Sequence, residues 1–455
     1  MNRDRAASFP AIRFLLLGLA CCLSACSRTD SDREGRVVVE YWEKWTDFER
    51  DAMARIVEEF NRSQNRIHVR FLSVSRVDQK MMLATAGGVP PDVAGLWDIN
   101  LPSYAENNAL KPLDRLAREA GLKESDYNPV FWRLCQYRGH LWALPSTPSV
   151  VALHWNKEMF RQVGLDPERP PASLAELEEF NRKLTQKNPD GSLAQIGHMP
   201  QEPGWWMVDF PSWFGGPSWD GGDRLLLDAP SGREFFGWLE SYPVRFGGPA
   251  LFKLRGAFGN FASPDNPFFN GKVAMVLQGV WLDNFIRKYA PAGFSYGVAP
   301  FPETIPHPGA PLTIAQTDVL VIPAGAKHPR EAMEFIAFVQ RQKTMEALCT
   351  AQRKLSPLAR VSEEFLRLHP HPYVREFQKL SQSRRARPTL RLPTMKEYSN
   401  DLITYSNLVL LGRLPGEKAR TEMLARQQKA LTAKLDRWNR VAEVRTAAWE
   451  REVNP

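Results

Sequence analysis

Beyond its first 25 residues, the sequence lacks any apolar run near the roughly 20 residues that a membrane-spanning helix needs. It also lacks the Gly-x-Ser-x-Gly nucleophile elbow, the phosphate-binding loop and the His-Glu-x-x-His zinc motif. The common signatures of serine hydrolases, P-loop nucleotide hydrolases and zinc proteases are therefore missing. We do not expect an enzyme.

Cysteine is scarce: of the five in the chain, only Cys26, Cys135 and Cys349 lie beyond residue 25. Cys135 and Cys349 form either a disulfide or two buried thiols, since the sequence does not show how far apart they lie. No cysteine–histidine cluster has the spacing of a metal site, and the nearest pair, His369 and His371, alternates with prolines as a loop does. We therefore expect no metal and no cofactor.

The chain carries only a modest excess of positive charge. Its formal net charge of +8 falls to +6 without residues 1–25, which hold three arginines and one aspartate. Basic residues gather between Arg384 and Arg391, but no aromatic residues are interleaved with them as in a nucleic-acid site. We expect a solvated basic face or loop there and no nucleic-acid partner, and an anionic ligand stays open.

The N-terminus has the pattern of an export signal. Arg3, Arg5 and Arg13 precede an apolar run over Phe14–Leu23, which ends in Leu-Ser-Ala-Cys at Cys26. A basic segment, a short apolar segment and small residues before a break are typical of a secretory signal peptide. Small residues directly before a cysteine also resemble the lipobox of bacterial lipoproteins, which implies a lipid on Cys26. The alternative is an ordinary signal peptide whose cysteines are incidental.

The expected products of export follow from this pattern. Residues 1–25 are a lipoprotein signal peptide and residues 26–35 a polar tether. The protein works in the periplasm or at the cell surface, anchored to the membrane by the lipid on Cys26. The 430 residues beyond residue 25 are too many for one simple core and suit two or three lobes.

The pattern after the tether alternates strands with helices. Val37–Tyr41, Ile67–Phe71 and Asp92–Leu96 are predicted strands, and helices are predicted from Asp47 to Phe60 and around 79–86. Such alternation is typical of parallel βαβ units in an α/β fold.

The pattern resumes in the second half of the chain. Separate strands are expected at Leu141–Leu144 and Val150–His154, and further strands at Val273–Leu277 and Asp318–Ile322. A charged helical tail is expected over 417–450. Between these segments, residues 201–222 hold four tryptophans broken by glycine and proline.

Five segments, in order along the chain, resemble motifs of one family: Val37–Trp45, Pro91–Leu110, Leu141–Phe160, Phe269–Trp281 and Val321–Ala332. The chain resembles the family 1 extracellular solute-binding proteins, which are the sugar-binding partners of bacterial ABC importers. Two positions depart from the family pattern: Trp155 stands where tyrosine is common, and Val273 stands where alanine is usual. Gln201-Glu202-Pro203, followed by aromatics, resembles the maltose-binding members.

The resemblance implies a two-lobe periplasmic-binding-protein type II fold, with a mostly parallel sheet flanked by helices in each lobe. Lobe one is expected to hold 36–147 with 315–360, and lobe two 148–314 with 361–455. The lobes close about a hinge around a ligand, and the closed form meets the permease subunits of the transporter. A monomer is expected.

A sugar site needs aromatic faces for C–H patches and polar side chains for hydroxyl pairs. The chain has 14 tryptophans, and many lie in loops after predicted strands, where ligands of open α/β sheets bind. With the resemblance, these loops predict a set of ligand-binding residues: Glu43, Lys44, Trp45, Trp97, Asp98, Trp205, Trp206, Trp281, Gln316, Thr317, Asp318 and Tyr398.

Several of these residues have a structural alternative. Trp45, Trp97 and Trp281 are also suited to core packing, and Asp98 to capping the next helix. Of the adjacent Trp205 and Trp206, one is expected to face the ligand and the other the core, because neighbouring side chains diverge.

Other functions remain possible at this point. A lipid-anchored glycoside hydrolase would need two carboxylates flanking one bond, and Glu43, Asp98 and Glu202 are available. A receptor that signals to a membrane sensor would use the same cleft. The ligand is a carbohydrate, expected to be an oligosaccharide, with an acidic sugar, glycerol phosphate or a polyamine as alternatives.

Overall fold

The structure is a computed structural model that describes residues 31, 32 and 34–454. The predicted signal peptide and the lipid site at Cys26 lie outside the described residues. No helix among the described residues has the length and apolar character needed to cross a membrane. Cys135 and Cys349 are buried free thiols, so the two are not bonded to each other.

Within the described part of the chain, ten strands form one mixed sheet, whose main path runs β2-β1-β3-β11-β6-β9-β8-β7. β10 pairs with β6, β12 pairs with β11, and β4 and β5 form a separate hairpin. The strands are β1 Val37–Glu43, β2 Ile67–Ser73, β3 Val93–Trp97, β4 Gln136–Tyr137, β5 His140–Leu141, β6 Leu144–Asn156, β7 Gln186–Lys187, β8 Leu193–His198, β9 Val273–Gly279, β10 Tyr296–Ala299, β11 Thr313–Val321 and β12 Ala386–Pro388.

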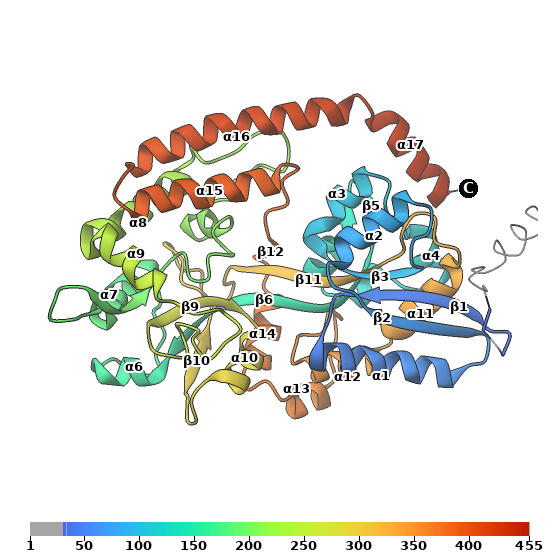
Figure 1. Cartoon of the computed structure of the whole chain (residues 1–455), viewed down its shortest axis with the longest axis horizontal. Helices are drawn as coiled ribbons and strands as arrows, with labels where there is room; N and C mark the ends of the chain where they lie inside the picture. Colours follow the sequence, from blue (N-terminus) through green and yellow to red (C-terminus); the bar gives the residue numbers. More distant parts are fainter. Residues whose placement is uncertain (1–30, 33, 455) are drawn as a thin grey trace, which may run out of the picture.

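Helices cover the sheet in two lobes that lie side by side (Figure 1). The helices of the first half are α1 Asp47–Ser63, α2 Val77–Ala86, α3 Leu101–Glu106, α4 Asp114–Glu119, α5 Pro129–Leu134, α6 Lys157–Gln162, α7 Leu174–Leu184, α8 Pro230–Phe246 and α9 Gly248–Gly256. The later helices are α10 Leu282–Tyr289, α11 Pro329–Val339, α12 Gln342–Gln352, α13 Glu363–Leu368, α14 Val374–Ser381, α15 Met395–Leu410, α16 Gly416–Asn439 and α17 Ala442–Val453. The 3-10 turns of the described residues are η1 Asp98–Asn100, η2 Glu124–Asp126 and η3 Phe210–Phe214.

Lobe one is built on the predicted βαβ units. β1 pairs in parallel with both β2 and β3. Between β1 and β2, helix α1 buries Met53, Ile56, Val57 and Phe60, the apolar positions whose helical spacing predicts the helix. The carboxyl ends of β1 and β3 therefore meet at one edge of the sheet, facing lobe two (Figure 1).

Two long strands cross between the lobes. β6 pairs with β11 through Leu144–Val150 and with β9 through 151–155, in both cases antiparallel. The sequence predicts two strands here, but one strand with every residue buried is found. Pro145 and Pro148 led to the prediction of a break between two strands, because proline has no N–H to donate to a neighbouring strand. Their partners on β11 lie at a register shift between Thr317 and Val319, so the ladder tolerates them.

Lobe two has an aromatic core. Phe210 packs against Trp238 and Phe301 at ring-centroid distances of 5.4 and 5.6 Å, and Trp213 packs against Phe301 at 5.2 Å. The Gly/Pro-rich middle segment thus serves packing at Trp213, which is buried. β8 and β9 form a parallel pair beside this core.

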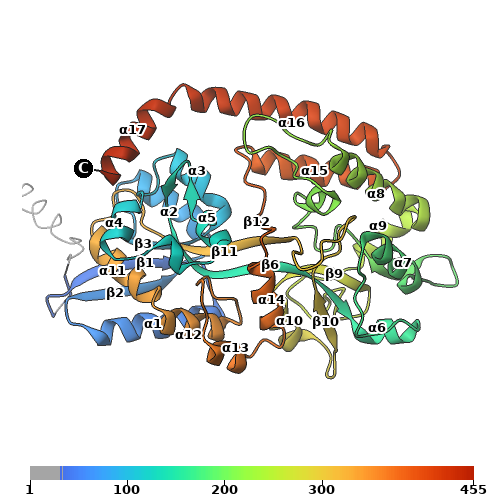
Figure 2. The same cartoon turned by 180° about the vertical axis from the view of Figure 1, so that it is seen from behind.

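The C-terminal helices extend over both lobes (Figure 2). α15 and α16 pack on α8 of lobe two, whereas α17 reaches α4 of lobe one. The sequence analysis places all of 361–455 with lobe two, whereas α17 contacts lobe one. The alternation of strands and helices does not predict which lobe a C-terminal helix contacts. The residue boundaries of the two lobes stay a prediction.

Candidate ligand cleft

A cleft of about 530 Å³ lies between the lobes, at the edge where β1 and β3 end and in front of the crossing strands. Its lining comes from distant parts of the chain. The lining residues are Lys44, Trp45, Thr46, Glu49, Trp97, Asp98, Ile99, Thr147, Ser149, Trp205, Phe261, Trp281, Phe285, Gln316, Thr317, Asp318 and Lys354.

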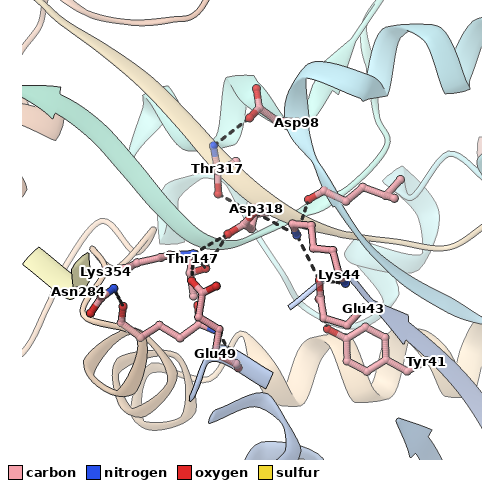
Figure 3. A network of polar contacts seen from close by, with 12 residues as sticks. Tyr41, Glu43, Lys44, Glu49, Asp98, Thr147, Asn284, Thr317, Asp318 and Lys354 are labelled. Atoms are coloured by element: carbon pink, nitrogen blue, oxygen red, sulfur yellow. Dashed lines mark hydrogen bonds and ion pairs between the residues drawn. The ribbon is translucent and has the colours of Figure 1, made fainter. Parts of the chain in front are cut away.

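A network of ion pairs centred on Asp318 forms one side of this cleft (Figure 3). Its Oδ1 lies 3.0 Å from Lys44 Nζ, and its Oδ2 lies 2.9 Å from Lys354 Nζ. The Thr147 hydroxyl, on β6, donates to Oδ2 at 3.1 Å. Asp318 lies on β11, so the network joins both crossing strands to the loops of lobe one.

Each lysine of the network is bound by a second carboxylate. Lys44 Nζ lies 3.2 Å from Glu43 Oε1, and Lys354 Nζ lies 2.9 Å from Glu49 Oε1. Glu43 is fully buried behind Lys44, where Tyr41 donates a hydrogen bond to its Oε2 at 2.5 Å. The cations are therefore compensated within the protein, as buried charges require.

The electrostatics follow from burial and this pairing. Burial alone would raise the pKa of Asp318, but the ammonium groups of Lys354 and Lys44 outweigh it and hold that pKa below its ordinary value. Burial raises the pKa of Glu43, against the attraction of Lys44. Asp318 is thus a permanently ionised acceptor at neutral pH.

Asp98 is the second carboxylate of the cleft and the least satisfied one. Its Oδ1 accepts a hydrogen bond from the Thr317 N–H at 3.0 Å, and its Oδ2 is buried with no partner. The side chain does not cap the turn that it begins. Burial raises its pKa to about 6, and Arg391 behind it opposes this rise. A buried oxygen without a partner lacks the hydrogen bond that would offset its desolvation, so this carboxylate is held at a cost in stability.

Aromatic side chains supply the rest of the lining. From lobe one come Trp45, which is buried, and Trp97, which is 46% exposed. Lys44 Nζ lies 4.9 Å from the Trp45 ring centre and 5.3 Å from that of Trp97. These cation–π contacts fix the position of the charge beside the two rings.

Lobe two contributes a wall of four aromatic residues. Trp205 is 50% exposed, and its ring lies 4.7 Å from Phe261, which lies 4.9 Å from Phe285. Trp281 completes the wall just after β9. The polar lining belongs to lobe one and the crossing strands, so a bound molecule would meet polar groups on one side and ring faces on the other.

Nine of the twelve sequence-predicted binding residues line this cleft, and Glu43, Trp206 and Tyr398 do not. Glu43 lies behind Lys44. Trp206 is buried, with its ring 5.9 Å from Trp281, while its neighbour Trp205 faces the cleft. Tyr398, on α15, is buried beside Ser218 and Asp209. Contact between any of the nine and a ligand stays a prediction.

The sequence prediction omitted eight lining residues: Thr46, Glu49, Ile99, Thr147, Ser149, Phe261, Phe285 and Lys354. Glu49 was accessible to sequence reasoning, because it lies in the first turn after the β1 loop. Ser149 lies opposite Gln316 on paired strands, which the register alone reveals. No sequence pattern marked Lys354 as a cleft residue, since only tertiary packing brings the end of α12 beside Asp318.

Other candidate chemistry lies outside the cleft. Glu202, offered as a catalytic carboxylate, is not a lining residue, although burial raises its pKa to about 7 against the pull of Arg255. The basic stretch is less solvated than expected: Arg385 pairs with Glu303, and Arg391 is half-buried behind Asp98. Among residues 31, 32 and 34–454, no cluster of His, Cys, Asp and Glu is arranged to hold a metal.

The chain is similar in sequence to a family of known proteins. Residues 46–346 match the family model described as bacterial extracellular solute-binding protein. The sn-glycerol-3-phosphate-binding periplasmic protein UgpB of Pectobacterium atrosepticum is 24% identical over 56% of this chain and 58% of its own length. The Escherichia coli K12 protein of the same name is 27% identical over 47% and 49%. The chain thus spans about half the length of these curated relatives.

Solved structures are similar over most of the chain. CpMnBP1, solved with mannotriose bound, is 26% identical with a TM-score of 0.71, covering 86% of this chain and 99% of its own. The sugar-binding protein MalE of Xanthomonas citri is 19% identical, also with a TM-score of 0.71, over 88% and 98%. The second likeness supports the two-lobe fold alone.

Proposed function

The chain belongs to the bacterial extracellular solute-binding proteins, and on that premise we propose that it is the substrate-binding component of an ABC importer and binds a neutral oligosaccharide in the inter-lobe cleft. The lobes close around the sugar, and the closed form delivers it to the permease subunits. The observation that carries the proposal is the two-sided cleft. Polar groups on lobe one suit sugar hydroxyls, and the aromatic wall of lobe two suits the C–H face of a pyranose ring.

The charge balance of the cleft favours a neutral ligand. Its two lining cations, Lys44 and Lys354, each contact two carboxylates already. A phosphate would have to compete with Asp318 for both, and would lie near Glu49 and Asp98 as well. The relatives named for glycerol 3-phosphate therefore do not decide the ligand here. CpMnBP1, with its bound mannotriose, is the better guide to a first probe.

The same cleft argues against glycoside hydrolysis. That reaction needs one carboxyl with a raised pKa and a second, ionised one placed across the scissile bond. Asp98 has the raised pKa, but the ionised Asp318 is bound by two ammonium groups and Glu43 is buried. We therefore expect no turnover of a bound oligosaccharide, which product analysis after prolonged incubation checks.

We also propose that the protein is attached to the membrane by a lipid on Cys26. β1 begins at Val37, so about ten residues of tether separate the anchor from lobe one. Metabolic labelling with a fatty acid, compared between the natural chain and Cys26→Ala, tests this: the label is expected in the first protein alone.

A thermal-shift screen tests the binding proposal. Mannotriose, maltotriose, glycerol 3-phosphate and spermidine are compared at concentrations up to the millimolar range. A ligand that binds only the folded state adds about 2.7 kcal/mol of stability at a hundredfold excess over Kd. We expect a saturable shift with a neutral oligosaccharide. A shift with glycerol 3-phosphate or spermidine alone would contradict the neutral-sugar assignment, although it would leave the solute-binding role intact.

A further inference from the structure

The C-terminal strap, residues 416–453, spans the two lobes as α16 and α17 (Figures 1 and 2). α16 has 24 residues, so its axis is about 36 Å long at 1.5 Å per residue. Because its backbone hydrogen bonds fix the rise of each residue, a continuous helix of this length holds its two ends at a nearly constant separation. None of the strap residues lines the ligand cleft.

The first half of α16 is fixed to lobe two by hydrogen bonds to its backbone. Arg420 Nη1 donates to the carbonyl of Leu227 at 3.2 Å. Gln428 accepts from the N–H of Leu225 at 2.9 Å and donates to the carbonyl of Asp223 at 2.6 Å. These contacts anchor the strap on lobe two.

The other end docks on lobe one through side chains alone. Trp438 stacks on Trp449 at 5.7 Å, and Trp449 meets Trp142 of lobe one edge-on at 4.9 Å. The Arg138 guanidinium lies 4.1 Å from the Trp438 ring centre. Lys434 Nζ lies 3.4 Å from Glu106 Oε2. We call this set of contacts the dock.

The strap is docked on lobe one in a structure where solvent reaches both walls of the cleft. Trp97 and Trp205, on opposite lobes, are 46% and 50% exposed. Closure brings these lobes together by rotation about the crossing strands, so it also shifts lobe one relative to any element rigidly fixed on lobe two. The dock must then slide or separate. Contacts that exist only in the open form stabilise it over the closed form.

We propose that the C-terminal strap is a releasable brake on lobe closure, which holds the cleft open through the dock and lowers the affinity for ligand. The proposal rests on the inter-lobe cleft being the binding site. When the binding-competent form is only partly populated, the apparent Kd rises in inverse proportion to its population. Weakening the dock therefore tightens binding without touching a cleft residue.

The test compares variants of the dock with a matched control on the same helix. Trp449→Ala removes the central ring of the dock. Lys434→Gln removes the ion pair between Lys434 and Glu106 of lobe one, and Lys434 is only partly buried, so its replacement leaves no cavity in a core. Arg426→Gln is the control, because Arg426 pairs with Asp401 of α15, within lobe two, at 2.8 Å. Kd for mannotriose is measured by titration calorimetry, after circular dichroism has confirmed folding.

We expect Trp449→Ala to lower Kd about fivefold or more, Lys434→Gln to lower it by a smaller factor, and Arg426→Gln to leave it unchanged. An unchanged or raised Kd in both dock variants would overturn the proposal, since the strap would then be indifferent to closure or would favour it.

A second readout needs no ligand and separates this proposal from the proposed function. Small-angle X-ray scattering of the free protein measures the radius of gyration, which falls as the lobes close. We expect a smaller radius for Trp449→Ala than for the natural chain and Arg426→Gln. If mannotriose fails to bind the natural chain, the sugar assignment is in question, whereas an unchanged radius in folded Trp449→Ala overturns the brake.

Discussion

At the scale of single residues, Trp97 and Trp205 are the half-exposed rings on opposite sides of the cleft. We expect Trp97→Ala and Trp205→Ala each to weaken sugar binding about tenfold, or about 1.4 kcal/mol, because each loses a ring face for the sugar. Titration calorimetry measures this. Trp219→Ala is the control, since Trp219 is a partly buried tryptophan outside the cleft. Equal loss in all three variants would contradict a specific role for the cleft rings.

Asp98 gives the fold a defined pH dependence. Its folded pKa of about 6 exceeds the ordinary 3.8, so folding takes up a proton between these values and stability falls as pH rises through that window. Asp98→Asn removes this loss, which is about 3 kcal/mol at most. We expect the variant to gain stability relative to the natural chain from pH 4 to pH 6, with no further gain above. Urea unfolding across pH 4–8 measures the difference, and a pH-independent difference would contradict the assignment.

Asp318 is the residue on which the ion-pair network depends. Asp318→Ala leaves Lys44 and Lys354 buried with one carboxylate each, and breaking such a buried pair costs about 3 kcal/mol or more. Asp51→Ala is the matched control, since the Arg50–Asp51 pair is exposed and contributes under about 1 kcal/mol. Denaturant unfolding at pH 7 compares them. Similar losses in both variants would mean that the network adds little to stability.

At the scale of elements, the end of β9 shows how a strand positions a cleft residue. A Cβ on Gly279 would lie 2.4 Å from the Trp281 ring, so the absence of a side chain there makes room for this tryptophan. We expect Gly279→Ala to displace Trp281 and weaken sugar binding severalfold, with a changed tryptophan fluorescence spectrum. Gly237→Ala in α8 has open space around its Cβ and is expected to bind normally. Normal binding by Gly279→Ala would show that the wall tolerates the shift.

Helices and strands were predicted correctly where the sequence pattern that specifies them lies within a few consecutive residues. α1 was predictable from Met53, Ile56, Val57 and Phe60, because a helical period is written in consecutive residues. β6 was predicted as two strands, because Pro145 and Pro148 are normally breakers and the compensating register shift lies on β11, far along the chain. The cleft residues on β6, Thr147 and Ser149, were missed for the same reason: whether they face the cleft depends on their pairing with β11, which is distant in sequence.

At the scale of the whole molecule, the two lobes share one ten-stranded sheet through β6 and β11 and are joined again by the C-terminal strap. Because neither lobe keeps its complete sheet when the other unfolds, we expect a single cooperative unfolding transition. Scanning calorimetry checks this, with agreement between calorimetric and van't Hoff enthalpies as the criterion. Two resolved transitions would mean that the lobes unfold independently.

The sequence by itself determined the α/β class and the family resemblance. It also showed that the loops after β1 and β3 line the cleft, and it identified most of the cleft tryptophans. These features depend on periodicity over a few residues and on the fact that parallel strands end at a common edge. Only the tertiary structure decided that Trp205 faces the cleft and Trp206 the core, that Lys354 pairs with Asp318, and that α17 docks on lobe one. Those outcomes depend on contacts between distant segments, and such contacts are decided by the packing of the whole chain.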